Sequence, residues 1–90
     1  MSLWSRLFGG KEGPAKNPPE THEGFTIYPE PINEGSRWRV SARIEKQIGG
    51  ELKSHRLIRA DTFQSLEEAV SASRAKAVQM IDEQGVRLFN

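Results

Sequence analysis

The segment from Arg37 to Glu45 constrains the fold most, because its side chains alternate strictly between apolar and polar. The apolar positions are Trp38, Val40, Ala42 and Ile44, and the polar positions are Arg37, Arg39, Ser41, Arg43 and Glu45. Successive side chains of a strand point to opposite faces of its sheet. The segment therefore predicts a strand with one face packed and the other in water. A length of 90 residues supports one small domain around such a sheet.

Two further strands are expected, one before this segment and one after it. Phe25–Tyr28 alternates and is closed by Pro29 and Pro31, and residues 30–36 form a loop. Gly49-Gly50 predicts a tight hairpin turn, because both glycines adopt positive φ at little cost. The third strand covers about residues 51–61 with a poorer pattern. Leu52, Ile58 and Ala60 share one parity while Leu57 has the other, so a bulge would have to switch faces and the register stays open.

One long helix follows the strands. Ser65 and Glu68 form a capping box, and Gly85 is a natural stop. The apolar stripe at helical spacing comprises Leu66, Ala69, Val70, Ser73, Ala77, Met80 and Ile81. The apolar tail at Val86, Leu88 and Phe89 is expected to fold back under the helix end or the sheet. The predicted class is α+β: a three-stranded antiparallel meander, then one C-terminal helix on one sheet face (β-β-β-α).

The first 23 residues have a different composition. Leu3, Trp4, Leu7 and Phe8 fall on one face of a short amphipathic segment. Residues 9–23 are rich in Gly and Pro and lack strongly apolar side chains, so they predict a flexible linker. The expected division is residues 1–23 as tail and residues 24–90 as a single domain. The apolar segment is either a frayed terminus or a docking element for its own domain or a partner. Membrane contact is the less favoured alternative, because stable anchoring needs two signals.

The formal net charge of +1 hides a strong segregation along the chain. Residues 17–34 carry four acids and no Lys or Arg, whereas residues 37–59 carry seven Lys or Arg against two acids. The predicted helix carries four acids against two bases. Basic charge is therefore concentrated on the two long strands.

These bases predict a candidate nucleic-acid surface on the open side of the sheet. The period of two places Arg37, Arg39 and Arg43 on one face, opposite Trp38 and Val40. If the third strand offers Lys53, His55 and Arg59 to the same face, a basic plate results that would bind phosphates. The alternative is a charged face that only keeps the sheet soluble. Strand register decides between them, because a one-residue slip turns every side chain to the other face.

Catalytic and metal-binding chemistry is poorly represented. Without cysteine there is no disulfide, thiolate zinc site or cysteine nucleophile. The two histidines, His22 and His55, lie in the predicted linker and in a strand, where Ser54 and His55 point to opposite faces. No metal-binding spacing or phosphate loop is present. We expect a non-enzymatic protein with no cofactor and no small-molecule substrate. The absence of a signal peptide or of a long apolar run predicts a cytoplasmic location.

Several segments resemble the HlyU family of short proteobacterial proteins. They are Gly24–Pro31, Trp38–Val40, His55–Phe63, Ile81–Gly85 with Leu88-Phe89, and the Leu7–Gly10 opening. The resemblance covers nearly the whole chain and implies a transcriptional activator. A virulence regulator that shares the name resembles a winged helix-turn-helix protein. This sequence predicts a single long helix, so no recognition-helix pair can be drawn from it.

Two functional hypotheses remain. In the first, a small regulator contacts nucleic acid through Arg37, Arg39, Arg43, Lys53, His55 and Arg59, with a steep salt dependence. In the second, a non-catalytic module docks on a protein or on a second copy. Its docking element is the open sheet face or the segment containing Leu3, Trp4, Leu7 and Phe8.

Overall fold

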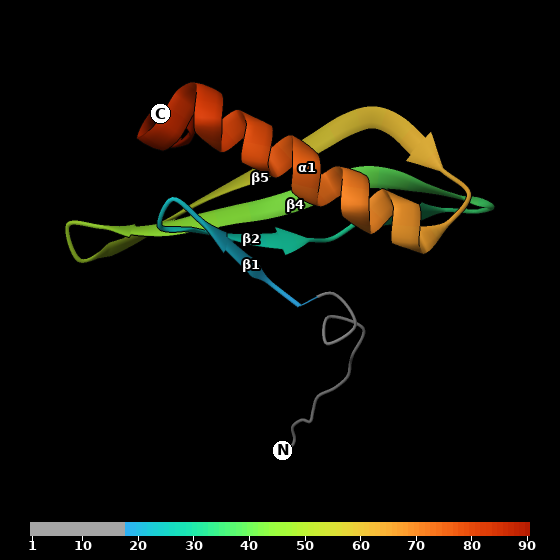
Figure 1. Cartoon of the computed structure of the whole chain (residues 1–90), viewed down its shortest axis with the longest axis horizontal. Helices are drawn as coiled ribbons and strands as arrows, with labels where there is room; N and C mark the ends of the chain where they lie inside the picture. The colour runs from blue at the N-terminus through green and yellow to red at the C-terminus, as the bar shows by residue number, and fades with distance from the viewer. Residues whose placement is uncertain (1–17) are drawn as a thin grey trace, which may run out of the picture.

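The computed structural model describes residues 18–90 as an antiparallel sheet covered on one face by a helix (Figure 1). The predicted α+β class is confirmed, but the sheet has five strands instead of three. The elements are β1 (Glu20–His22), β2 (Phe25–Pro29), β3 (Ile32–Glu34), β4 (Arg37–Ile48), β5 (Glu51–Phe63), α1 (Leu66–Gln84) and the 3-10 helix η2 (Gly85–Phe89). The prediction for Leu3, Trp4, Leu7 and Phe8 lies outside the described residues.

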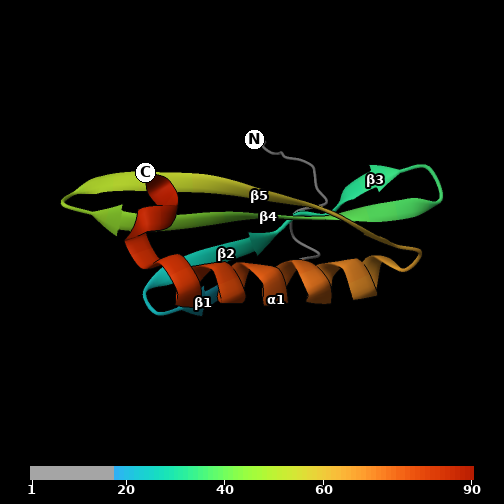
Figure 2. The same ribbon diagram turned by 90° about the horizontal axis from the view of Figure 1, so that it is seen from above.

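Strand β4 organises the sheet, because it pairs with three other strands. One of its edges pairs with β2 and, further along, with β3, while the other edge pairs with β5 over most of its length (Figure 2). Strand β3 lies inside the predicted loop. The strand pairing with β4 is interrupted between β2 and β3 at Glu30-Pro31, because proline has no N–H for the ladder. Glu30 N–H still donates to the Ser41 carbonyl, at 2.9 Å, which holds the break against β4.

Strand β1 is the second addition, and it lies inside the segment predicted as a flexible linker. A two-residue turn at Glu23-Gly24, with φ of 53° and 83°, folds β1 back onto β2. Positive φ at both central residues is the geometry of a type I′ hairpin turn. The linker prediction is therefore wrong for residues 20–22. The predicted turn at Gly49-Gly50, with φ of 60° and 80°, is confirmed.

The core lies between α1 and one face of the sheet. Ile27 and Ile44 are fully buried there against Ala77 and Ile81 of the helix. The predicted helix start is confirmed, since Ser65 Oγ accepts a hydrogen bond from Glu68 N–H. The tail also folds back as expected: Leu88 is buried, and the Phe89 ring stacks on Phe25 at 5.9 Å between centroids.

A bulge in β5 is present, but it lies beyond Leu52, Leu57 and Ile58, and of the apolar positions that it was expected to reconcile it includes Ala60 alone. Arg39 pairs with Thr62 and Ser41 pairs with Ile58, so residues 59–61 of β5 face Val40 alone. From Ile58 back to Glu51 the pairing is uninterrupted. Leu57 is consequently in the core, whereas Leu52 and Ile58 share the opposite face and are 54 % and 53 % exposed. The register that the sequence left open is therefore the one that buries Leu57 and exposes Leu52 and Ile58.

Candidate functional site

The sheet face opposite α1, called the open face below, carries a network of arginines and glutamates. Arg43 lies at its centre. Its guanidinium pairs with Glu45 and, at 3.1 Å, with Glu30, and it covers the Tyr28 ring at 4.1 Å from the centroid. Arg56 of β5 also binds Glu30, at 2.9 Å, so one carboxylate joins two arginines from neighbouring strands.

The electrostatic state of Arg43 follows from these contacts. Partial burial alone would lower the pKa of its guanidinium, because desolvation disfavours the charged form. The hydrogen bonds to Glu30 and Glu45 outweigh this effect and raise the pKa. Arg43 is thus a fixed cation whose charge is already matched by two carboxylates.

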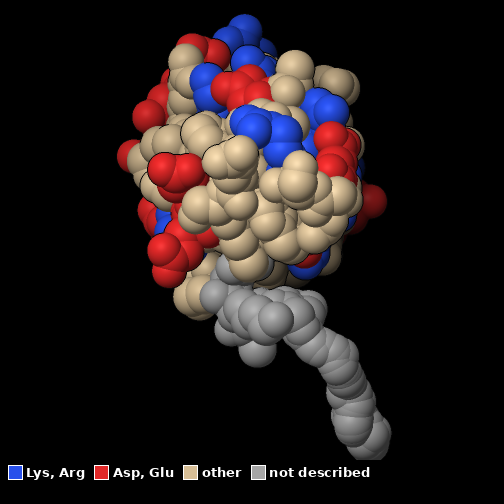
Figure 3. Space-filling view, turned by 90° about the vertical axis from the view of Figure 1, so that its right-hand side faces the viewer, with Lys and Arg blue, Asp and Glu red and all other residues tan. Residues whose placement is uncertain are grey.

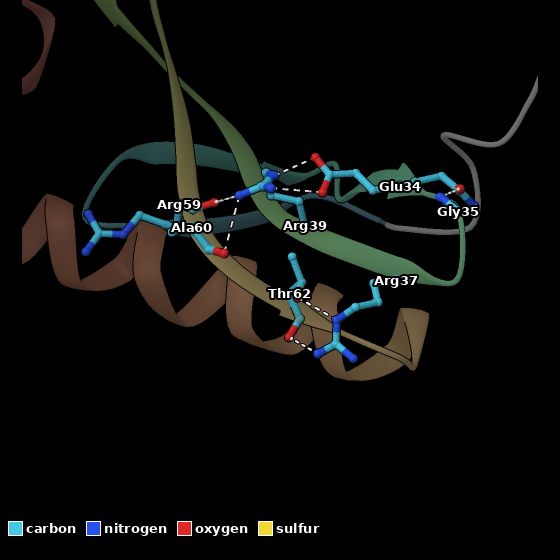
Figure 4. A network of polar contacts seen from close by, with 8 residues as sticks. Glu34, Gly35, Arg37, Arg39, Arg59, Ala60 and Thr62 are labelled. Atoms are coloured by element: carbon cyan, nitrogen blue, oxygen red, sulfur yellow. Dashed lines mark hydrogen bonds and ion pairs between the residues drawn. The ribbon is translucent and has the colours of Figure 1, made fainter.

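A second pair lies where β3 meets β4 (Figure 4). The Arg39 guanidinium forms a fork with the Glu34 carboxylate, with N–O distances of 2.6 and 2.9 Å. Its remaining nitrogen donates to the carbonyls of Arg59 and Ala60 in the β5 bulge, at 3.2 and 3.3 Å. The hydrogen bond to Arg39 lowers the pKa of Glu34, and the same bond raises the pKa of Arg39. Arg39 therefore fills the bulge as well as neutralising an acid.

Arg37 differs from the other arginines of the face. Its Nε donates to Thr62 Oγ1 at 2.6 Å and its Nη2 to the Thr62 carbonyl at 2.9 Å. Among residues 18–90, no carboxylate lies within ion-pair distance of Arg37. Within this part of the chain, its positive charge is oriented by neutral oxygens alone.

The structure brings together only part of the predicted basic plate. Arg37, Arg39 and Arg43 share the open face as expected. Lys53 and His55 do not, because they pair with Lys46 and Ile44 and so lie on the side covered by α1. Arg59 sits in the bulge, with its guanidinium directed away from the network in Figure 4. Their expected placement on the same face as Arg37 is wrong for Lys53 and His55.

Arg56 takes the place that Lys53 and His55 were expected to fill. It pairs with Arg43, and it was missed because the basic-plate hypothesis put Lys53, His55 and Arg59 on this face, which turns Arg56 to the other face. Four arginines and three glutamates now share the face, namely Arg37, Arg39, Arg43 and Arg56 with Glu30, Glu34 and Glu45. One positive charge is left over. Figure 3, which views the molecule from one end, likewise shows acidic and basic side chains interspersed.

A separate pair of contacts fastens β1 to α1. His22 Nε2 lies 2.8 Å from Asp82 Oδ1, and Arg74 Nε lies 2.9 Å from Glu20 Oε1. The hydrogen bond to Asp82 raises the pKa of His22 against a smaller opposing effect of desolvation, with help from Glu20 and Glu23. No local sequence pattern indicates this contact, because it joins residues that are 60 positions apart.

Within residues 18–90, no group of three or more His, Cys, Asp or Glu is placed to hold a metal ion. No helix of this part is long and apolar enough to cross a membrane. Its helices are α1 and the short η2, so it contains no pair of α-helices of the helix-turn-helix kind.

Comparison with protein families gives one match, to the family described as transcriptional activator HlyU, over residues 2–89. The chain belongs to this family. The match covers nearly all of the sequence, and it confirms the resemblance carried by the segments around Tyr28, Trp38 and Phe63. No curated protein and no solved structure matches the chain.

Proposed function

We propose that this HlyU-family chain is a non-enzymatic transcriptional regulator that works through protein contacts. Its open face binds a polypeptide segment that presents a carboxylate beside apolar side chains. The observation that carries this proposal is the pairing of Arg39, Arg43 and Arg56 with carboxylates of the same face.

Those carboxylates make the face a poor phosphate surface. A nucleic-acid phosphate would have to displace Glu30 or Glu34 from charge-assisted hydrogen bonds, and the displaced carboxylate would stay nearby and repel it. Nucleic-acid binding draws its affinity from many uncompensated cations, each of which releases counterions. The open face has an excess of one positive charge, so this contribution is small.

The same face has the composition of a protein interface. Arginine and tyrosine are enriched at such interfaces, and Arg43 stacked on Tyr28 is held in place before any partner arrives. Exposed aliphatic side chains accompany the charges: Ile32 is 37 % exposed at one edge of the face and Ile58 is 53 % exposed near the other.

Arg37 defines the chemistry of the partner. Its guanidinium is oriented by Thr62 and has no carboxylate partner among the described residues, so it can accept one from outside. Ile32 lies on the same face, two positions before Glu34, the β3 residue opposite Arg37 in the strand register. A carboxylate flanked by apolar side chains matches this arrangement.

An NMR titration of the ¹⁵N-labelled full chain tests the proposal. The probe is a peptide alternating Asp or Glu with Leu or Phe, and the control peptide has Lys at the acidic positions. We expect the acidic peptide to shift the amides of Ile32, Arg37 and Ile58, and Arg37→Glu to abolish these shifts. Lys76→Glu, on α1, should leave them unchanged.

Two results would contradict the proposal. One is the absence of shifts on the open face at millimolar acidic peptide. The other is a shift of the same amides by a random DNA duplex but not by the peptide, which would favour the nucleic-acid hypothesis.

A further inference from the structure

The outer edge of β5 is a second surface, distinct from the open face. β5 pairs with β4 on one side, and no strand of the described part pairs with its other side. Figure 2 shows β5 running along the border of the sheet, on the side away from β1. An unpaired edge strand presents free backbone N–H and C=O groups that can pair with another strand.

Two of the usual protections against pairing, a proline and a bulge, are absent from most of this edge, although Lys53 and Arg56 lie within it. A bulge disrupts residues 59–61, but residues 51–58 form a regular strand with uninterrupted register. No proline occurs in β5. Leu52 and Ile58, at the two ends of the regular stretch, are each more than half exposed. A regular edge flanked by exposed aliphatic side chains is suited to strand addition.

The side chains of the edge complement one another when a second copy approaches in the antiparallel direction. Consider a symmetric antiparallel pair of β5 strands whose two-fold axis passes through His55. A residue that precedes His55 in one copy then faces the residue that follows His55 by the same number of positions in the other copy. Leu52 then faces Ile58. Glu51, which also forms an ion pair with Lys53 of its own strand at 3.3 Å, faces Arg59, the first residue of the bulge. The symmetry produces each of these contacts twice, so the edge offers two apolar pairs and two opposite-charge pairs. The remaining positions set Lys53 against Leu57, Ser54 against Arg56 and His55 against itself, and they bring no like charges of Lys, Arg, Asp or Glu together.

Neighbouring symmetric registers lack this complementarity. Moving the axis to Arg56 places two Arg56 side chains together and sets Glu51 against Asp61. Moving it to Ser54 sets Leu52 against Arg56 and Glu51 against Leu57. Facing residues must point to the same face of the joined sheet, so the symmetry axis can pass through a residue but not between two residues.

We propose that β5 pairs with β5 of a second copy, antiparallel and centred on His55. The two sheets then join into one, with both α1 helices on one side and both open faces on the other. The edge shares Ile58 with the open face, but the side chains of Glu51 and Arg59 take no part in the proposed partner site, so variants of these two residues separate dimerisation from partner binding. A contact limited to one pair of strands is small, and a weak dimer with a Kd in the micromolar to millimolar range is expected.

Sedimentation equilibrium of the full chain over a wide range of concentrations tests the proposal. Charge reversal gives the sharpest comparison. Glu51→Arg or Arg59→Glu alone should weaken the dimer about tenfold, since each change places like charges opposite each other at two symmetry-related sites. The double variant Glu51→Arg/Arg59→Glu restores opposite charges, so its Kd should return toward that of the wild type.

Apolar variants provide a second, independent comparison. Ile58→Lys should also weaken the dimer, while Ile32→Lys, on the same face but at the other border of the sheet, should not. Circular dichroism checks that each variant is folded. A chain that stays monomeric at millimolar concentration would overturn the proposal. A dimer that is unaffected by both single charge reversals would do so too, as would a double variant that is as weak as the singles combined.

Discussion

The two faces of the sheet use the same strand, β4, in opposite ways. On the covered face, Val40, Ala42 and Ile44 are fully buried under α1, where small helix residues allow close approach. On the open face, Arg39 and Arg43 pair with glutamates from other segments. The covered face is stabilised by removing apolar area from water, and the open face by many contacts that stay partly hydrated.

This difference determines where stability and where function reside. Burial of aliphatic side chains contributes several kilocalories per mole at each site, whereas an exposed ion pair contributes less than about 1 kcal/mol. Substitutions on the covered face should therefore lower the free energy of unfolding strongly. Substitutions on the open face should change what it binds while leaving it folded.

The largest expected effect comes from the covered face. Ile44→Ala removes a fully buried side chain between the sheet and α1 and leaves a cavity. We expect a loss of about 3 kcal/mol in the free energy of unfolding, measured by urea denaturation. The matched control is Ile32→Ala on the open face, with an expected loss below about 1 kcal/mol. Equal losses would contradict the distinction between the faces.

A smaller effect is expected where α1 meets the irregular part of β4. Ser73 is buried, and its Oγ accepts a hydrogen bond from Ser41 N–H at 3.1 Å while donating to the Ala69 carbonyl at 2.6 Å. The register shift beside Ser41 interrupts the ladder there, and Ser73 supplies the missing acceptor. Ser73→Ala should cost about 1–2 kcal/mol, because it leaves a buried amide unpaired.

The exposed Ser71 provides the control for this substitution. Ser71→Ala should be neutral or slightly stabilising, because alanine has the higher helix propensity. If Ser73→Ala were equally harmless in urea denaturation, the hydrogen bond to Ser41 would not hold the helix on the sheet.

The same contrast explains how much of the fold the sequence predicts. The elements of the covered face follow local patterns: the alternation around Val40, the cap at Ser65 and the stripe through Ala77. All three are visible in a window of a few residues, and they are confirmed except at Ser41, which the alternation placed in water and which is buried. Strands β1 and β3 are three residues each and are held by pairing with β2 and β4, so their own sequences carry little periodicity.

The open face was predicted less well, because it depends on contacts between distant segments. The arginines of β4 were placed correctly by parity. Their partner Glu30 lies in a break between strands, and the position of Arg56 depends on a bulge that begins only after Ile58. Neither feature leaves a local signal. Charge along the sequence therefore suggested a basic plate where folding produces a nearly balanced network.

The smallest expected effect is a pH dependence at the border of the covered face. The pKa of His22 is raised by its hydrogen bond to Asp82, with Glu20 and Glu23 adding to the shift. The stabilisation is present in full below the ordinary histidine pKa of about 6.5. It is lost as the pH rises through the higher pKa of the folded state.

Thermal unfolding of the wild type and Asp82→Asn between pH 5.5 and 8.5, as an approximate range around the pKa of histidine, measures this effect. The wild type should have the higher Tm at the acidic end, and the difference should shrink as the pH rises. A difference that grows with pH would contradict the assignment of this contact.

The most direct test of the balanced open face is the binding of a labelled random DNA duplex at low and moderate salt, followed by fluorescence anisotropy. The wild type is compared with Glu30→Gln/Glu34→Gln/Glu45→Gln, which keeps the hydrogen-bonding shape of the face but removes its negative charges. We predict negligible binding by the wild type at low salt. The variant should gain binding that weakens with salt, with a log–log slope of about −2 to −3 for the freed arginines. Tight, salt-sensitive binding by the wild type, lost in Arg39→Glu/Arg43→Glu, would show instead that the glutamates do not shield the face.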